Sequence, residues 1–410
     1  MRALLSAVGT RGDVQPAVAL ALELRTLGHA VRLCISPNFV DWAKSLGLEA
    51  RPMGVEMRLP PPAAGAAPAL TPEELRRLWK SMPDLITDQF ETIGAAAEGC
   101  DVIVGANAHQ YAAPSIAARA GIGCVTAVYT PVALPSPDLA PPPAPGTTAG
   151  QTTGASIGEL WRNTATAWND RALGRINDNR LRLGMDAIDD VLDYVLTSRT
   201  WLAADAALAP IPNTPGRTIF QTGAWVFVDR TPLPADLQAF LDRGEQPIFA
   251  GFGSMPAAAG AGRLLLGAAR AVGRRLLLSK GWAGLELIDE APDCMAVGDV
   301  SHDLLFPRVA AVLHHGGAGT TAAAARAGIP QVITPTAGDQ FYWARRIVDL
   351  ELGATTSYPT MTAESLAGAL REALAPAVAV RARAFAGEVR SDGAAVAARR
   401  LEMEFGGAGK

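Results

Sequence analysis

Two successive series of short strands, each apolar along its whole length, constrain the fold of this chain most strongly. The first series is expected at residues 3–8, 31–36, 102–106 and 124–129, with helices such as 16–27 and 38–46 between them. The same pattern begins again at 248–253 and continues at 275–279, 295–297, 310–314 and 331–335. Strands that are apolar on both faces are typical of a parallel sheet covered by helices on both sides. The sequence therefore predicts two α/β domains in series, which a length of 410 residues also favours.

The boundary between these domains is expected where turn-forming residues gather, at 209–216 (APIPNTPG) and 231–234 (TPLP). We expect a first domain at 1–215, a linker at 216–238, a second domain at 239–388 and a C-terminal helix and tail at 389–410. The Pro-rich segment near 210–234 is the candidate hinge between the domains. That C-terminal part is helical in character, with a break expected at 391–393.

Two Pro-rich stretches of the first half, 60–65 and 135–155, are expected to be loops. Loops of such length in a compact domain are usually functional or disordered.

Composition and charge exclude several classes of protein. With 49% hydrophobic residues the chain buries enough apolar surface to fold, and its net charge of −4 argues against a nucleic-acid partner. No run approaches the roughly 20 uncharged apolar residues of a membrane-spanning helix. The apolar start is soon followed by Arg11 and Asp13, which favours a buried first strand over a signal peptide. The four cysteines are scattered without a C-x-x-C motif, which predicts buried free thiols in a reducing, cytoplasmic compartment.

The loops after the strands are where ligands bind in open α/β sheets. The first of them, 9–16 (GTRGDVQP), matches neither the dinucleotide-binding G-x-G-x-x-G pattern nor a Walker A loop. Asp13 there has two interpretations: a cap that accepts backbone N–H groups of the following helix, or a carboxylate base at the mouth of a cleft. Arg11 and Gly12 are candidates for contact with the molecule on which that base would act.

The most informative loop is 314–321 (HHGGAGTT), which lies between an apolar strand and a helix. Small residues at a helix N-terminus leave free N–H groups for an anion, so we expect a pyrophosphate site. Its candidate residues are His314, His315, Gly316, Gly317, Gly319 and Thr320. The alternative is a tight turn with one buried and one surface histidine. Adjacent side chains in a strand point in opposite directions, so only one histidine is expected to face the ligand.

Further loops supply candidates for contacts with the rest of a ligand that carries the pyrophosphate. Asp339 and Gln340 offer acceptors and donors to sugar hydroxyls, although a helix cap is the alternative. Ser254 could donate to a phosphate, and Lys280, Trp282 and Val300 could line the base pocket or cleft. The chain contains no Asp-x-Asp sequence, so the usual carboxylate clamp for a divalent metal is missing and no metal is expected.

The loop 314–321 and the sequence GDQ at 338–340 together resemble the donor signature of family 1 glycosyltransferases with the GT-B fold. The loop 9–16 resembles the N-terminal signature of the branch that holds vancomycin-type antibiotic glycosyltransferases, sterol glucosyltransferases and mycobacterial glycolipid glycosyltransferases. Similarity to the glycopeptide enzymes extends to 201–205 (WLAAD), 221–225 (QTGAW) and 279–282 (SKGW). The version GDQFYW at 338–343 is closer to the sterol enzymes.

The resemblance implies two Rossmann-like doubly wound domains that face a cleft, with a C-terminal helix crossing back to the N-terminal domain. The acceptor then belongs to the first domain and the nucleotide sugar to the second. By position, Asp13 is implied as the general base, where many plant-type relatives use a histidine in that region. Alternatively, Asp13 only orients the acceptor, or Asp339 shares the role.

The expected activity is therefore inverting, metal-independent transfer of a hexose from a UDP- or dTDP-sugar to a large lipophilic acceptor, such as an antibiotic aglycone, a sterol or a glycolipid. We expect no prosthetic group and a monomer or weak dimer, with His109, Tyr111 and Trp79 as candidate acceptor contacts. One rival interpretation is a nucleotide-sugar epimerase, against which the long apolar loops of the first half argue. The other is an auxiliary protein that activates a partner glycosyltransferase, although such proteins lose the donor residues that this chain keeps.

Overall fold

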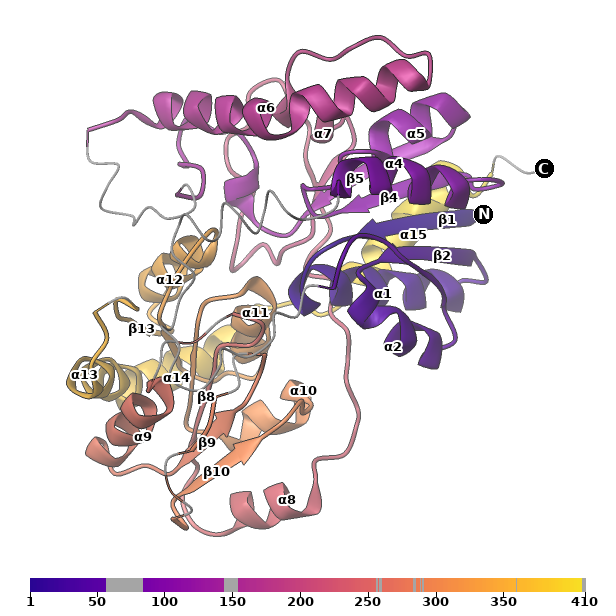
Figure 1. The fold of residues 1–410 in the computed structure, drawn as a ribbon. Coiled ribbons are helices and arrows are strands. Elements are labelled where there is room, and N and C mark those ends of the chain that lie inside the picture. Colours follow the sequence, from indigo (N-terminus) through magenta and orange to yellow (C-terminus); the bar gives the residue numbers. More distant parts are fainter. Residues whose placement is uncertain are drawn as a thin grey trace.

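The chain forms two parallel sheets, each covered by helices on both faces (Figure 1). The structure is a computed structural model, and it describes residues 1–56, 84–143, 154–255, 257, 260–282, 285–287, 289, 291–358 and 360–407. The strand order of the first sheet is β3 (Glu49–Pro52), β2 (Ala30–Ile35), β1 (Arg2–Ala7), β4 (Val102–Ala106), β5 (Gly123–Val128), β6 (Thr200–Leu202) and β7 (Phe220–Gln221). The order of the second is β10 (Cys294–Val297), β9 (Leu276–Ser279), β8 (Ile248–Gly251), β11 (Ala311–His314), β12 (Gln331–Ile333) and β13 (Gly353–Thr355). The predicted α/β fold with two domains in series is confirmed.

The helices connect these strands. In the first domain they are α1 (Arg11–Thr26), α2 (Val40–Ser45), α4 (Leu85–Ala96), α5 (Ala113–Ala120), α6 (Ile157–Arg182) and α7 (Val191–Val195), with short 3₁₀ turns at Pro37–Phe39 and Pro131–Ala133. In the second they are α8 (Ala235–Asp242), α9 (Ala261–Ala271), α10 (His302–Leu305), α11 (Ala318–Arg326), α12 (Gln340–Asp349), α13 (Ala363–Ala373) and α14 (Pro376–Ala386), with a 3₁₀ turn at Phe306–Arg308. The last helix is α15 (Gly393–Phe405).

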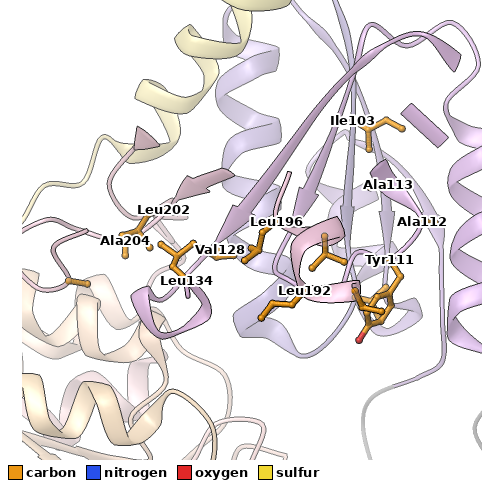
Figure 2. Close-up of a cluster of buried hydrophobic side chains, with 14 of the residues drawn as sticks. Ile103, Tyr111, Ala112, Ala113, Val128, Leu134, Leu192, Leu196, Leu202 and Ala204 are labelled. Carbon is orange, nitrogen blue, oxygen red and sulfur yellow. The ribbon is translucent and has the colours of Figure 1, made fainter. Parts of the chain in front are cut away.

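Alternate residues of each strand point to opposite faces of the sheet, and both faces are apolar. In β1, Ala3 and Leu5 pack with α1, α2 and α15, whereas Leu4 packs on the other side with α4, α5 and α7. Strand β1 pairs in parallel with β2 and β4, with Leu4 opposite Arg32 and Ile103. Figure 2 shows part of the second cluster, including Ile103 and Leu202 from the strands and Leu192 and Leu196 at α7. The uniform apolarity of the strands thus follows from burial on two sides.

The sequence predictions of individual elements hold with shifted ends. The expected strands are present, and the structure adds β3, β6, β7 and β13, which are short or carry polar residues. The expected helix at 16–27 begins earlier, at Arg11, so that Pro16 lies inside it and most of the predicted loop is helical. Strand β7 falls inside the predicted linker 216–238, whose limits stay a prediction. The stretches 60–65 and 144–153, and Trp79, lie outside the described residues.

Helix α15 crosses back to the first domain, as expected. Figure 1 shows it, in yellow, beside α1 and away from α14 in the second domain. Its buried residues Ala394, Ala397, Ala398 and Leu401 belong to the core of the first domain. A predicted break separates α14 from α15, and there the backbone N–H of Arg390 donates to the buried carboxylate of Asp205 at 2.8 Å.

Two glycines touch where the chain enters α15. A Cβ on Gly393 would lie 2.4 Å from the carbonyl oxygens of Gly223 and Ala224, so no larger residue fits there without moving backbone. We expect Gly393→Ala to lower the free energy of unfolding by about 1–3 kcal/mol, as overpacking does, when measured by urea denaturation. Gly368→Ala in α13 is the matched control, because its Cβ meets nothing within 4 Å. A G393A protein as stable as G368A would contradict the close packing.

Further structural facts agree with the composition analysis. The first strand is buried from Ala3 onward, as expected for a folded segment. All four cysteines are free thiols; Cys34, Cys100 and Cys294 are buried and Cys124 is partly buried. Among the described helices, none combines the length and apolarity needed to cross a bilayer, and the 26-residue α6 is strongly polar.

Candidate functional site

The carboxyl ends of the two sheets face each other. Arg11, which follows β1, pairs through Nη2 with Oδ2 of Asp299 after β10, at 2.9 Å. The ring of Trp282, after β9, stacks on Phe39, after β2, with 6.0 Å between ring centroids. The loops in which the sequence placed the candidate residues therefore meet between the two domains.

Asp13 is held in a fixed orientation at this edge of the first sheet. Its Oδ2 accepts hydrogen bonds from the backbone N–H of Thr10 at 2.8 Å and from the Thr10 hydroxyl at 3.2 Å. Its Oδ1 accepts from the side-chain amide of Asn107. Asp13 is thus the third residue of α1 and not its N-cap, which is Thr10. Gly9 makes room for it, because a Cβ there, at φ +144°, would lie 2.1 Å from Oδ2.

The environment of Asp13 favours the protonated form. Burial raises the pKa of this carboxyl above its ordinary value, and the hydrogen bonds from Thr10 and Asn107 offset only part of the effect. A carboxylate with a raised pKa is a stronger base, which suits removal of a proton from a hydroxyl.

Asn107 is a site residue that the sequence analysis missed. It follows β4 and adopts φ +82°, a left-handed conformation that few residues other than glycine take. Its Oδ1 accepts from the backbone N–H of His109 at 2.9 Å. Its one sequence signal was its place at the carboxyl end of a buried parallel strand, where the other candidates were sought.

His109 and Tyr111, the candidate acceptor contacts, form an aromatic cluster with Trp168 of α6. The His109 ring stacks on Trp168 at 5.0 Å between centroids, and its Nδ1 lies 2.9 Å from the Tyr111 hydroxyl. His109 is exposed, although desolvation by the surrounding protein lowers the pKa of its ring to about 4. Figure 2 shows the Tyr111 ring at the margin of the buried cluster. Tyr111 meets Trp168 edge-on, so the three rings form an aromatic, partly apolar wall in the first domain.

The two adjacent histidines have different environments. His314 is completely buried: its Nε2 lies 2.9 Å from Oε1 of Gln331, and its Nδ1 accepts from the backbone N–H of Gly316 at 3.1 Å. Burial lowers its pKa to about 3, so the ring is neutral and both nitrogens are occupied within the protein. His314 therefore shapes the turn from inside.

His315 points to the opposite side, toward the start of α11. A Cβ on Gly317 would lie 2.7 Å from its Nε2, and one on Gly253 would lie 3.3 Å from its Cε1. Its Nδ1 is buried without a hydrogen-bond partner among the described residues. Burial lowers the pKa of His315 to about 4.

Helix α11 begins at Ala318, three positions after His315, with Gly317 as its N-cap. No side chain of the described residues caps the helix, and the first intrahelical bond runs from the Thr321 N–H to the Gly317 carbonyl at 3.0 Å. The N–H groups of Ala318, Gly319 and Thr320 thus have no intrahelical acceptor. The helix begins at Ala318, inside the loop 314–321 expected from the sequence, so Gly319 and Thr320 lie in its first turn.

Asp339 and Gln340 stand at the start of α12. Asp339 is its N-cap residue, and its Oδ2 accepts from the Trp343 indole N–H at 2.9 Å. Gln340 uses Oε1 to accept from the backbone N–H of Thr336 at 2.8 Å, which orients its amide nitrogen away from that turn. Burial raises the pKa of Asp339 to about 6, the Trp343 bond lowers it, and the charge of Asp13 raises it further. The two carboxylates are therefore within electrostatic reach of each other.

The raised pKa of Asp339 makes stability depend on pH. Between about pH 4 and 6 the folded protein keeps a proton that the unfolded chain releases, so the free energy of unfolding falls as pH rises through this window. Asp339→Asn cannot show this loss, so we expect the stability of the variant relative to the wild type to grow by about 2 kcal/mol from pH 4 to pH 7. Urea denaturation at several pH values measures it. Asp349→Asn, at the exposed end of α12, is the control, and an equal pH response of both variants would contradict the prediction.

The remaining candidates lie around the same edge. Ser254 is half-buried after β8, Lys280 is exposed, and Val300 packs beside the core cluster of the second domain. The Trp282 ring stacks on Phe39, and the backbone N–H of Trp282 donates to the Gly253 carbonyl at 2.9 Å. Their roles toward a ligand stay predictions, as does that of the exposed Gly12.

One group of side chains among the described residues has the geometry to hold a metal ion, and it lies elsewhere. This group consists of Asp289, Asp293 and Cys294, next to the start of β10. It therefore lies at the amino end of that strand, whereas the candidate site residues lie at the carboxyl ends. Arg270 is paired with both carboxylates, at 3.1 and 2.7 Å. These acids are thus part of an ion-pair network remote from the site.

Comparisons with known proteins agree with this geometry. Residues 3–126 match the glycosyltransferase family 28 N-terminal domain, and residues 263–398 match the C-terminal domain of erythromycin biosynthesis protein CIII-like proteins. The chain is 44% identical to glycosyltransferase GtfE of Amycolatopsis orientalis, covering 99% of this chain and 98% of that protein. It is also 44% identical to the vancomycin aglycone glucosyltransferase of the same organism, covering 98% and 97%. The solved glycotransferase of kitacinnamycin shares the fold, with a TM-score of 0.73, 19% identity and coverage of 98% and 99%.

Proposed function

Because the chain belongs to family 1 of the GT-B glycosyltransferases and so transfers hexoses from nucleotide sugars, we propose that it uses a UDP- or dTDP-sugar, inverts the anomeric centre and needs no metal ion. The acceptor is a hydroxyl of a large lipophilic molecule. One observation carries the proposal: a half-buried carboxylate of raised pKa, Asp13, lies across from Asp339 of the second domain.

The transfer is a single displacement at the anomeric carbon. The acceptor oxygen forms a bond to that carbon while the bond to the diphosphate oxygen breaks, and the acceptor proton passes to Asp13. Thr10 occupies Oδ2 of Asp13 with two hydrogen bonds, whereas Oδ1 accepts only from Asn107. Since each carboxylate oxygen can accept about two hydrogen bonds, Oδ1 is the atom that takes the proton.

The departing diphosphate is stabilised by the start of α11. The free N–H groups of this first turn and the positive end of the helix dipole attract the developing negative charge. His315, which overlies Gly317, donates from its ring to a phosphate oxygen, and Thr320 and Ser254 add hydroxyl donors. His314 acts only by fixing the turn. With these donors, charge neutralisation does not require a divalent cation.

The hexose is held by Asp339 and by the amide nitrogen of Gln340. The acceptor lies against His109, Tyr111 and Trp168, whose aromatic rings suit a flat, partly apolar molecule. An antibiotic aglycone is favoured among such molecules, because a relative identical over 44% of its residues is named for the vancomycin aglycone. The protein acts in the cytoplasm as a monomer or weak dimer.

A screen of donors against acceptors tests the proposal. UDP-glucose and dTDP-glucose are combined with the vancomycin aglycone, macrolide aglycones and sterols, each with and without EDTA, and products are detected by mass spectrometry. We expect a β-linked product from an α-linked donor, formed equally in EDTA, with its configuration read by NMR. Loss of activity in EDTA or a retained configuration contradicts the mechanism. An auxiliary protein would show neither transfer nor slow hydrolysis of the donor.

A further inference from the structure

We propose that Asn107 is a positioning residue that aims Oδ1 of Asp13 at the acceptor hydroxyl. The inference rests on the proposed function, in which Asp13 is the base. Asn107 contributes no proton and touches no substrate in this scheme. It acts only through the carboxylate to which its amide donates.

A chain of hydrogen bonds fixes the amide of Asn107 in one orientation. The backbone N–H of His109 donates to its Oδ1 at 2.9 Å, so its Nδ2 must face Asp13. His109 is fixed in turn, since its carbonyl accepts from the side-chain amide of Gln89 at 3.0 Å. Gln89 is completely buried and its Oε1 accepts from the Tyr111 N–H at 2.8 Å. The aromatic wall of the acceptor site and the base are thereby joined through one asparagine.

The backbone of Asn107 supports a functional role. Its φ of +82° is a strained conformation for most residues other than glycine, and it persists where the surroundings enforce it. Here the backbone N–H of Asn107 donates to the Ala127 carbonyl at 2.7 Å on β5. Glu351 is the one other non-glycine residue with positive φ among the described parts of the chain. Asparagine tolerates this conformation better than most residues, so one side chain serves both requirements.

A neutral amide is chemically suited to this position. A positive charge beside Asp13 would stabilise the carboxylate strongly and weaken it as a base, whereas an amide orients it with a smaller effect on basicity. The titratable groups that act electrostatically with Asp13 are Asp339, across the site, and Tyr129, whose hydroxyl donates to the Asp13 carbonyl at 3.1 Å. Changing Asn107 leaves both in place.

The test compares Asn107→Gly and Asn107→Asp with the wild type. Glycine keeps the positive φ while removing the amide, and aspartate keeps the size while replacing the donor by a second carboxylate. The Asp13 carboxyl is followed by carbon-13 NMR on protein labelled at aspartate Cγ, its signal being the one absent from an Asp13→Asn sample. We expect the Asp13 pKa to rise by about 1–2 units in N107G, because one hydrogen bond to the charged form is lost. In N107D the upper pKa of the carboxylate pair rises further.

Asn177→Ala is the matched control. This asparagine of α6 also uses both ends of its amide, with the N–H and carbonyl of Ile188 at 2.8 and 3.0 Å, but it belongs to a different hydrogen-bond network. We expect N177A to leave the Asp13 pKa unchanged and all variants to bind UDP as the wild type does in calorimetry. An unchanged Asp13 pKa in N107G overturns the inference. If instead Asp13→Asn keeps a normal transfer rate, the proposed base itself is wrong, whatever N107G shows.

Discussion

Replacing Asp13 by asparagine is expected to reduce kcat by about 10²- to 10⁴-fold, the usual contribution of a positioned base. The variant keeps the size of the side chain but cannot accept a proton at the pH of the reaction. Donor affinity should remain, because the diphosphate is expected at α11 in the other domain. Steady-state transfer rates and calorimetry with UDP and dTDP separate the two quantities.

The control for this experiment is Asp41→Asn, an exposed carboxylate of α2 in the same domain. It removes the same charge from the first domain without touching the site, so its kcat should equal that of the wild type. The pH profile adds a second criterion. The acid limb of kcat/KM in the wild type should lie above the usual range of an aspartate, since burial raises the Asp13 pKa. A D13N enzyme with near-native turnover would show that Asp13 only orients the acceptor.

The second large effect is expected at the histidine pair, where two neighbouring substitutions should fail in different ways. His315→Ala should lower kcat/KM by about 10²- to 10³-fold, as removal of one preorganised donor to a leaving anion does. Binding of UDP or dTDP should weaken as well. The folded state should keep its stability, because the His315 ring makes no hydrogen bond to the described residues.

His314→Ala should instead lower the free energy of unfolding by about 2–4 kcal/mol, because it leaves a cavity and two unpaired buried groups. Those groups are the Gln331 amide oxygen and the Gly316 N–H. Denaturation curves and diphosphate affinities of both variants, measured side by side, distinguish the roles. The two roles would have to be exchanged if H314A kept native stability but lost diphosphate binding, or if H315A lost stability but kept diphosphate binding.

Much of the fold could be predicted because burial on two faces leaves a clear trace in sequence. Strands β1, β4, β8 and β11 are continuous apolar runs, and their loops carry the residues that resemble a known signature. Strands β6, β7 and β13 have two or three residues each, too few to show a pattern. The start of α1 was predicted too late because proline favours the first turn of a helix, whereas Pro16 lies beyond the first turn of α1.

The site was predicted less completely, for reasons that are local. Alternation along the strand showed that only one histidine of the pair could face a ligand. The structure buries His314, because its ring is hydrogen-bonded to Gln331 of the neighbouring strand and the chain turns at Gly316 with φ +95°. Neither feature can be read from the sequence. Asn107 was missed because an isolated asparagine after a strand has no distinctive spacing. Its role follows only from the contact with Asp13, 94 residues away in sequence.

The paired glycines at 223 and 393 also govern how the two halves of the molecule can move. The chain passes between the halves twice, once after β7 and once before α15, and both passages meet where these glycines touch. Two passages of the chain that meet at one point form a pivot. The halves can swing about this point but cannot slide apart or rotate independently. Opening about this pivot must therefore break two contacts that join the halves, the pair of Arg11 with Asp299 and the stack of Trp282 on Phe39.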